Sequence, residues 1–192
     1  MPTLTIRDTA PTVENPCYRS VQFNGYNRCI IRNPQTGFVL PNCVGYAWGR
    51  FLEANNLTDC RLSTGNASSW WYNTGDGYQR GSVPKIGAVG CYGGGSYGGA
   101  GHVLFVERIN PDGTILCSES NYGGEVFQMR TLAPDAEIGW NLWFQGFIYS
   151  PTDFDGTSGE PIVPDPDPPY NPRKRFKWWL SKKIINERKE GE

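Results

Sequence analysis

The clearest pattern of apolar and polar positions along the chain is a helical one between residues 42 and 55. Apolar side chains recur there at helical spacing and share one face: Val44, Ala47, Trp48, Phe51 and Leu52. Asn42 precedes them as a favourable N-cap residue, and the pair Asn55-Asn56 ends the pattern. We therefore expect a helix over residues 42–55, and a second, short helix over residues 65–72.

Beyond residue 86 the pattern changes to that of β-strands. Five short runs rich in β-branched and aromatic residues follow, at 87–92, 102–109, 114–120, 126–132 and 143–150. The turn signal Pro111-Asp112-Gly113 joins the second run to the third as a hairpin. Helices followed by antiparallel strands predict an α+β domain.

The two ends of the chain differ in composition from this central part. Residues 1–23 form an extended lead-in, and the globular domain covers residues 24–150. Residues 151–172 alternate proline with aspartate, which is typical of a stiff linker. Residues 173–192 form a basic, aromatic tail with eight Lys and Arg against three Asp and Glu, although the net charge of the chain is only −1.

Composition excludes several classes of protein. No apolar stretch approaches the roughly 20 residues that span a bilayer, and the first residues lack the apolar core of a secretory signal. Six cysteines without C-x-x-C spacing, together with a single histidine, make a zinc site unexpected. We expect most of the cysteines to be reduced, while a turn at Asn24-Gly25 leaves a Cys17–Cys29 bridge open.

Two residues stand out for their chemistry. Cys43 lies at the start of the predicted helix, where unpaired N–H groups and the helix macrodipole favour a thiolate. His102, the sole histidine, begins a predicted strand and is the one imidazole that could take the thiol proton. Taken separately, each residue could equally be structural, Cys43 as a small apolar core residue and His102 as a buried strand residue.

A catalytic imidazole usually has a third group that fixes its orientation. Glu119 and Asn121 are two residues apart on the strand that the hairpin pairs with the His102 strand, so they share a face. Either the carboxylate or the amide could therefore meet the imidazole. The alternative is that both are exposed polar residues at a strand end.

Taken together, these segments resemble the CHAP family of cysteine, histidine-dependent amidohydrolases and peptidases, found in phage endolysins and bacterial cell-wall hydrolases. The matching segments are N-C-V-G-Y-A-W-G-R at 42–50, G-N-A at 65–67, P-K-I-G-A-V at 84–89, G-H-V at 101–103, D-G-T-I at 112–115, S-E-S-N-Y at 118–122 and G-F-I at 146–148. Their order and spacing agree with the family over roughly residues 24–150.

The resemblance implies a papain-like α+β fold, in which the helix carrying the cysteine packs on an antiparallel sheet. It also implies that Cys43 is the nucleophile, His102 the base, Glu119 the residue that orients the histidine and Asn121 an accessory polar group. The implied reaction is hydrolysis of an amide in peptidoglycan, by an N-acetylmuramoyl-L-alanine amidase or an endopeptidase of the stem or cross-bridge. The aromatic residues Trp48, Trp70, Trp71 and Tyr122 are candidates for contacts with this substrate.

Some features depart from the family. Certain relatives bind calcium through an acidic loop before the cysteine, but residues 33–41 hold no carboxylate, so we expect no metal and no cofactor. In the tail, cations alternate with bulky apolar residues, as in segments that bind anionic wall polymers or a membrane surface. A solvated tail and a helix docked on a partner remain alternatives, and we expect no nucleic-acid binding.

The sequence leaves more than one function open. The leading hypothesis is a phage lysin made in the host cytoplasm, which reaches the wall after holin release or on the virion. A catalytically silent wall-binding or virion structural module with the same fold is the first alternative. A cysteine protease or transamidase acting on proteins is the second.

Overall fold

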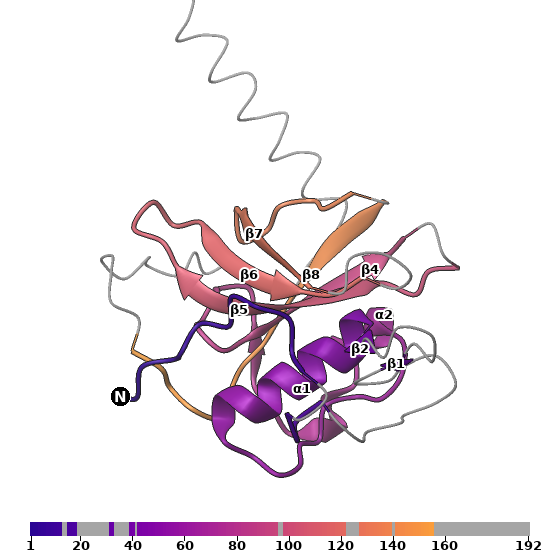
Figure 1. The fold of residues 1–192 in the computed structure, drawn as a ribbon. Helices are drawn as coiled ribbons and strands as arrows, with labels where there is room; N and C mark the ends of the chain where they lie inside the picture. The colour runs from indigo at the N-terminus through magenta and orange to yellow at the C-terminus, as the bar shows by residue number, and fades with distance from the viewer. Residues whose placement is uncertain are drawn as a thin grey trace, which may run out of the picture. The chain divides into compact units, whose positions relative to one another are not determined.

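The structure is a computed structural model, which describes residues 1–12, 15–18, 31–32, 39–40, 42–95, 98–121, 127–139 and 141–155. The part of the chain described holds two helices, one 3-10 turn and eight strands (Figure 1). Residues 19–23 of the expected lead-in lie outside the described residues. So do residues 156–192, which include most of the expected linker and all of the tail.

The main helix, α1 (Cys43–Asn55), begins and ends where the pattern predicts. The Asn42 side chain accepts a hydrogen bond from the Gly45 amide at 2.8 Å, and Asn56 closes the helix in a left-handed conformation with φ of 51°. However, α1 is buried on all sides over its first ten residues rather than on one face. The ring of Tyr18 covers its outer side at Gly49, where a Cβ atom would lie 2.5 Å from the ring.

The second helix is shorter than expected. Only one helical turn, α2 (Ala67–Trp70), lies within the predicted range of 65–72. It is followed by the 3-10 turn η1 (Thr74–Asp76), at the position where the sequence Gly75-Asp76-Gly77 predicts a turn. The guanidinium group of Arg80 stabilises this region, because it donates to the carbonyl oxygens of Trp71 and Asn73 and to the Asp76 carboxylate.

Six antiparallel strands form one sheet in the order β3-β8-β4-β5-β6-β7. Their bounds are β3 (Arg80–Gly81), β4 (Val89–Gly94), β5 (His102–Ile109), β6 (Ile115–Glu119), β7 (Gln128–Leu132) and β8 (Leu142–Ile148). The five predicted strands are thus confirmed, with ends that shift by one or two residues. Three two-residue strands were not expected: β3, and the separate hairpin of β1 (Ile31–Arg32) and β2 (Val39–Leu40).

Both helices lie on the same face of the sheet (Figure 1). Side chains from that face of β4 and β5 pack against them and form the larger apolar cluster, which includes Phe51, Trp70, Cys91, Val103 and Phe105. The opposite face carries a second cluster, which includes Tyr92, Leu104, Ile115, Phe144 and Phe147. The expected α+β, papain-like architecture is therefore confirmed, with the cysteine-bearing helix packed on an antiparallel sheet.

A buried ion pair joins α1 to β5. Arg50 donates to both carboxylate oxygens of Glu107, through Nε at 2.8 Å and through Nη2 at 2.7 Å. Both side chains are almost inaccessible to solvent, with side-chain exposures of 3% and 0%. The Ser118 hydroxyl on β6 donates to the same carboxylate at 2.6 Å, so one acidic group links three elements.

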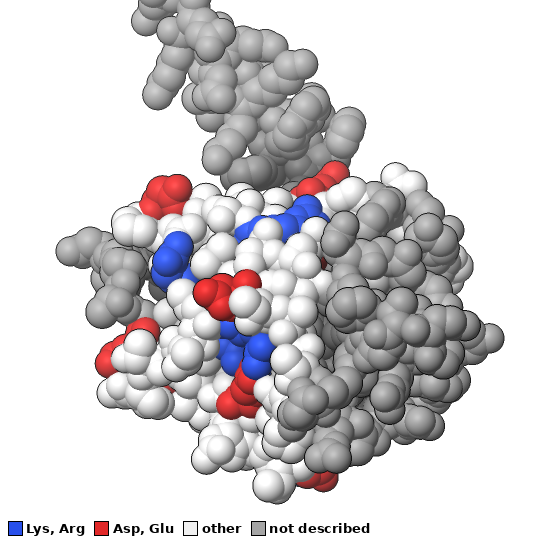
Figure 2. Space-filling model, viewed as in Figure 1, with Lys and Arg blue, Asp and Glu red and all other residues white. Residues whose placement is uncertain are grey.

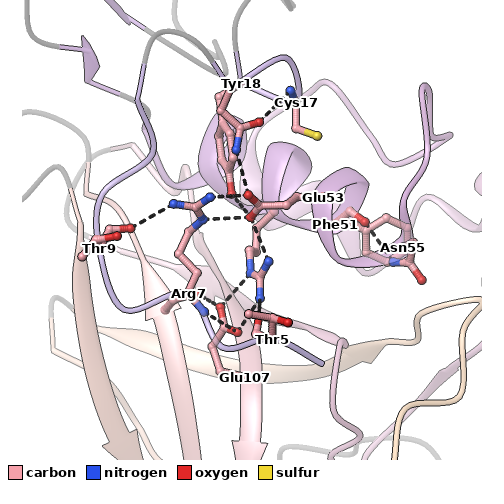
Figure 3. Close-up of polar contacts among 12 residues, drawn as sticks. Thr5, Arg7, Thr9, Cys17, Tyr18, Phe51, Glu53, Asn55 and Glu107 are labelled. Atoms are coloured by element: carbon pink, nitrogen blue, oxygen red, sulfur yellow. Dashed lines mark hydrogen bonds and ion pairs between the residues drawn. The ribbon is translucent and has the colours of Figure 1, made fainter. Parts of the chain in front are cut away.

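The N-terminal segment is held by the same group of charges (Figure 3). The Thr5 carbonyl accepts from Arg50 at 2.7 Å, and the Arg7 amide donates to Glu107 at 3.3 Å. The Arg7 guanidinium forms an ion pair with Glu53, which also receives Arg50 at 2.8 Å. These contacts make the first residues part of the folded unit, although they hold no helix or strand.

This arrangement predicts the stability of a variant at the buried pair. Glu107→Gln removes the charge that compensates Arg50, and a buried charge without its partner is costly, so we expect a loss of about 3 kcal/mol in the free energy of unfolding. Urea unfolding measures it. The control Asp153→Asn, at an exposed carboxylate, is expected to cost less than about 0.5 kcal/mol. Equal losses in the two variants would contradict the role given to the pair.

Candidate active site

The structure places Cys43 at the first residue of α1. Its residue exposure is 9%, and it is a free thiol. The Asn42 side chain caps the Gly45 amide, and the Asn42 carbonyl accepts from Tyr46. The cap therefore leaves the amides of Cys43 and Val44 at the positive end of the helix, where they can face a negative charge.

His102 is the first residue of β5 and is 4% exposed. Its Nε2 atom lies 2.6 Å from a carboxylate oxygen of Glu119, the last residue of the neighbouring strand β6. The imidazole is also hydrogen-bonded to the Cys43 side chain. Since Nε2 is engaged by Glu119, Nδ1 is the ring nitrogen left for the sulfur. The structure thus brings together three of the four predicted catalytic residues in one chain of contacts.

Glu119 is completely buried, and β7 supplies further donors to it. Its second oxygen accepts hydrogen bonds from Gln128 and, at 3.1 Å, from Arg130. Burial raises the pKa of the Glu119 carboxyl, but the contacts with His102 and Arg130 outweigh this effect and hold the pKa below its usual range. The carboxylate therefore stays ionised. It holds the imidazole ring in one orientation and stabilises the protonated form of the ring.

The charge state of the imidazole follows from its neighbours. Burial by itself lowers the pKa of His102, because the cation loses its hydration. The adjacent Cys43 and then Glu119 outweigh burial and raise this pKa to about 9. The imidazole is thus protonated at neutral pH and places a positive charge beside the sulfur of Cys43.

Asn121 follows β6 by two residues. Continuing the antiparallel pairing of Phe105 with Ser118 places it opposite His102. Its Oδ1 atom is buried and accepts no hydrogen bond from the described part of the chain. Asn121 therefore lies opposite His102 at the end of the neighbouring strand, and its oxygen is not engaged by any described donor.

Sequence reasoning missed two members of this site. Gln128 and Arg130 contact Glu119 because the β6–β7 register pairs Glu119 with Gln128, and alternation puts Arg130 on the same face. The alternation within residues 126–132 was visible in the sequence. The sequence did not show that these two side chains contact Glu119, because that contact depends on the register between β6 and β7.

The predicted substrate-binding aromatic residues occupy different surroundings. Trp48 and Trp70 are 5% and 0% exposed and belong to the apolar cluster, so neither presents a surface to a ligand. Trp71 is half-buried, and its ring packs on Gly146 of β8. Tyr122 lies outside the described residues. An exposed tryptophan that the sequence did not single out, Trp143, lies on β8.

The remaining described cysteines are unsuited to nucleophilic chemistry. Cys91 and Cys117 are fully buried, and burial raises the pKa of both thiols. Burial also raises the pKa of Cys60 to about 12. Cys17 is a free thiol, so the disulfide that the Asn24-Gly25 turn left open is not formed; Cys29 lies outside the described residues.

The described residues hold neither a metal-binding cluster nor a membrane-spanning helix. They contain no cluster of three or more His, Cys, Asp or Glu side chains placed to hold a metal ion. Among the helices of the same described ranges, none is long and apolar enough to span a bilayer.

Comparison with known proteins agrees with this geometry. Residues 33–121 match the family model of the CHAP domain. The chain is 35% identical over 113 residues to Probable autolysin SsaALP of Staphylococcus aureus (strain NCTC 8325 / PS 47), which covers 55% of this chain and 39% of that protein. It is 32% identical over 105 residues to the N-acetylmuramoyl-L-alanine amidase sle1 of S. aureus (strain MRSA252), which covers 51% of this chain and 28% of that protein.

Solved structures with a related sequence or fold are also known. A crystal structure of an N-acetylmuramoyl-L-alanine amidase from S. aureus shares 29% identity, with a TM-score of 0.41 over 55% of this chain and 30% of that one. The crystal structure of Ly7917 shares 16% identity, with a TM-score of 0.42 over 73% of this chain and 63% of that one.

The chain spans less than half the length of the two curated relatives described above. The match to the family model includes Cys43, His102, Glu119 and Asn121. The chain therefore contains a CHAP domain and is a homologue of staphylococcal cell-wall autolysins and amidases.

Proposed function

We propose that this chain is a peptidoglycan hydrolase that cleaves an amide bond by a thiol mechanism. The observation that carries the proposal is the continuous set of contacts from Cys43 through His102 to Glu119. Its homologues are named as autolysins and amidases, which supports the bacterial cell wall as the substrate.

The geometry supports a two-step reaction. In the first step, the Cys43 thiolate attacks the amide carbonyl carbon, and the negative charge that develops on oxygen meets the amide groups at the start of α1. His102, protonated at Nδ1, gives its proton to the departing nitrogen as the C–N bond breaks. A thioester and a free amine result.

In the second step, the now neutral His102 takes a proton from water, and the hydroxide attacks the thioester carbonyl. The C–S bond breaks, a carboxylic acid leaves, and the thiolate–imidazolium pair is restored. Throughout, Glu119 holds Nε2 of the imidazole and stabilises its cationic form.

The finer features of the function belong to the same proposal. The bond cut is the sugar–peptide amide or one within the stem or cross-bridge peptide, and the names of the amidase homologues favour the first. The resemblance to phage endolysins supports a lysin that is made in the host cytoplasm and reaches the wall through a holin or on the virion. Mass spectrometry of released muropeptides identifies the bond through the new amine.

The first prediction of the proposed function concerns the nucleophile. Cys43→Ala removes the only described thiol that contacts the imidazole, so we expect the rate of peptidoglycan cleavage to fall by roughly 10⁴-fold or more with the fold retained. Loss of turbidity of purified Gram-positive walls measures the rate. The control Cys91→Ala removes a buried thiol of β4 and is expected to retain activity. Equal loss in both variants would refute the assignment.

The second prediction concerns Glu119 and pH. Below about pH 9 the imidazole of His102 carries the proton that the leaving nitrogen needs, and this proton is lost as the pH rises through that value. Glu119→Gln removes one cause of the raised pKa, so the alkaline limb of the rate profile is expected to move to lower pH. The groups facing His102 are Cys43 on α1 and Glu119 on β6, with Arg130 on β7 behind Glu119.

We also expect Glu119→Gln to lower kcat/KM by about 10²-fold, less than Cys43→Ala does. The profile is measured between about pH 6 and about pH 10. Asp112→Asn, a change in the exposed β5–β6 turn, serves as the control and should leave both rate and profile unchanged. An alkaline limb that stays in place in Glu119→Gln would contradict the role of the carboxylate.

The third prediction concerns residues 161–192, which lie outside the described residues. We propose that the basic tail raises affinity for the anionic wall and takes no part in bond cleavage. Charges of opposite sign are interspersed on the face of the globular unit that Figure 2 shows, so this face has no extensive basic surface of its own.

A chain of residues 1–160 is therefore expected to bind walls at least about tenfold more weakly at physiological salt, with an unchanged rate on soluble muropeptides. Pull-down with purified walls and a soluble-substrate assay separate the two effects. If the shortened chain binds and lyses walls as well as the full chain, the tail has no such role.

A further inference from the structure

Trp143 is unusually exposed for a tryptophan within a sheet. It lies on β8 with 43% of its surface accessible, whereas Phe144 beside it is 8% exposed. A large apolar side chain held open to solvent gains little from folding. Its position therefore suggests contact with a ligand.

The indole ring is held against the backbone of β4. A Cβ atom on Gly93 would lie 2.8 Å from Nε1 of the indole, and one on Gly94 would lie 2.6 Å from Cε3. Only glycine at both positions allows the ring to approach this closely. The ring is thereby fixed in place, with the rest of its surface exposed.

A buried amide lies next to the ring. A Cβ atom built on Gly93 would also lie 2.9 Å from Nε2 of Gln145. This Nε2 atom donates a hydrogen bond to the Ser68 carbonyl of α2 at 3.2 Å. Gln145 is 8% exposed, and its Oε1 atom accepts no hydrogen bond from the described residues. We call the surface formed by Gly93, Gly94, Trp143 and Gln145 the aromatic shelf.

The aromatic shelf lies at the same end of the strands as the catalytic residues. The β4 strand pairs Tyr92 with His102 on one side and Gly93 with Trp143 on the other. Because neighbouring strands are about 4.8 Å apart, the backbones of His102 and Trp143 are about 10 Å apart.

The aromatic shelf also faces the same side of the sheet as Cys43. Successive residues of β4 point to opposite faces of the sheet, so Gly93 and Cys91 lie on the same face. Cys91 packs in the apolar cluster between the sheet and the helices α1 and α2. The contact of Gln145 with Ser68 of α2 confirms this side. His102 pairs with Tyr92, so its side chain begins on the opposite face, and it is Cys43 that shares the side of the aromatic shelf. A polymer bound at Cys43 could extend from this end of the sheet over the aromatic shelf.

The chemistry of the aromatic shelf is neutral. It combines an exposed indole, the indole N–H, a primary amide and two glycines, with no charged side chain among them. The peptide stems of peptidoglycan carry carboxylates and amines, whereas its glycan strand is a neutral chain of acetylated sugar rings apart from the lactyl group. The apolar face of a sugar ring suits an aromatic surface, and its hydroxyl and N-acetyl groups suit the adjacent polar groups.

We propose that the aromatic shelf binds an N-acetylhexosamine ring of the glycan strand and so positions the substrate over Cys43. This inference rests on the proposed function, because it takes peptidoglycan as the substrate. It assigns to Trp143 a binding role that is separate from the chemistry of the Cys43–His102–Glu119 group.

The experiment measures binding of a neutral probe to the full chain carrying Cys43→Ala. Chitotetraose, the β-1,4-linked tetramer of N-acetylglucosamine, has no peptide and no net charge, so the basic tail cannot attract it electrostatically. Calorimetry or NMR titration gives the dissociation constant. A synthetic stem peptide is titrated in parallel.

Trp143→Ala is expected to weaken binding of the tetramer about tenfold and to leave binding of the stem peptide unchanged. Trp143→Phe keeps an aromatic ring and should stay within about threefold of the parent chain. Tyr72→Ala removes a tyrosine that is 69% exposed after α2, and it should have no effect. If Trp143→Ala does not fold, Gly93→Ala displaces the ring through the close contact with Nε1 and should weaken binding similarly.

Three results would overturn the inference: no binding of the tetramer by the parent chain, equal binding by Trp143→Ala, or a loss that affects the stem peptide instead. Wall lysis by the unmodified chain tests the proposed function separately. A chain that binds the tetramer through Trp143 but never cleaves peptidoglycan would refute the proposed function and leave the sugar-binding surface in place.

Discussion

The buried pair of Arg50 and Glu107 is the contact on which the arrangement of this molecule depends. Arg50 lies two helical turns after Cys43 on α1, and Glu107 lies five residues after His102 on β5. A bidentate contact between them fixes how far the helix is advanced along the strand and how it is rotated about its axis. The distance between the sulfur and the imidazole follows from that alignment.

Such a pair contributes more to specificity than to stability. Removing two charges from water costs several kcal/mol, and the contact between them does little more than offset that cost. An apolar pair could pack the helix on the strand in several neighbouring registers. A guanidinium and a carboxylate, further engaged by the Thr5 carbonyl and the Ser118 hydroxyl, are satisfied in only one.

Charge is organised in the same manner at the other end of β5. The Glu119 carboxylate on β6 contacts His102 on β5 and accepts hydrogen bonds from Gln128 and Arg130 on β7. Both of its oxygens are therefore engaged. Together with the adjacent Cys43, its ionised form raises the pKa of the imidazole. The charge of the imidazole beside Cys43 thus depends on a chain of contacts that runs across α1, β5, β6 and β7.

Local patterns in the sequence were sufficient for the main elements. The helix of 43–55 has a capping asparagine and an apolar face, and β4 to β8 contain enough β-branched and aromatic residues to be recognised. The strand β3 could not be predicted, because two residues without periodicity form a strand only through pairing with β8. The burial of α1 on all sides was also missed, since the covering ring of Tyr18 comes from a segment without regular structure.

The candidate residues show the same division. The sequence alone determined that a lone histidine and a helix-starting cysteine were available, with Glu119 and Asn121 near them, because each property is local or rests on a family pattern. Only the tertiary structure decided that Gln128 and Arg130 hold Glu119, that Trp70 is buried in the core and that Trp143 is exposed. The physical reason is that strand register and burial are set by contacts between residues far apart in the chain, and a stretch such as 142–148, apolar on both faces, does not reveal which of its side chains will be covered.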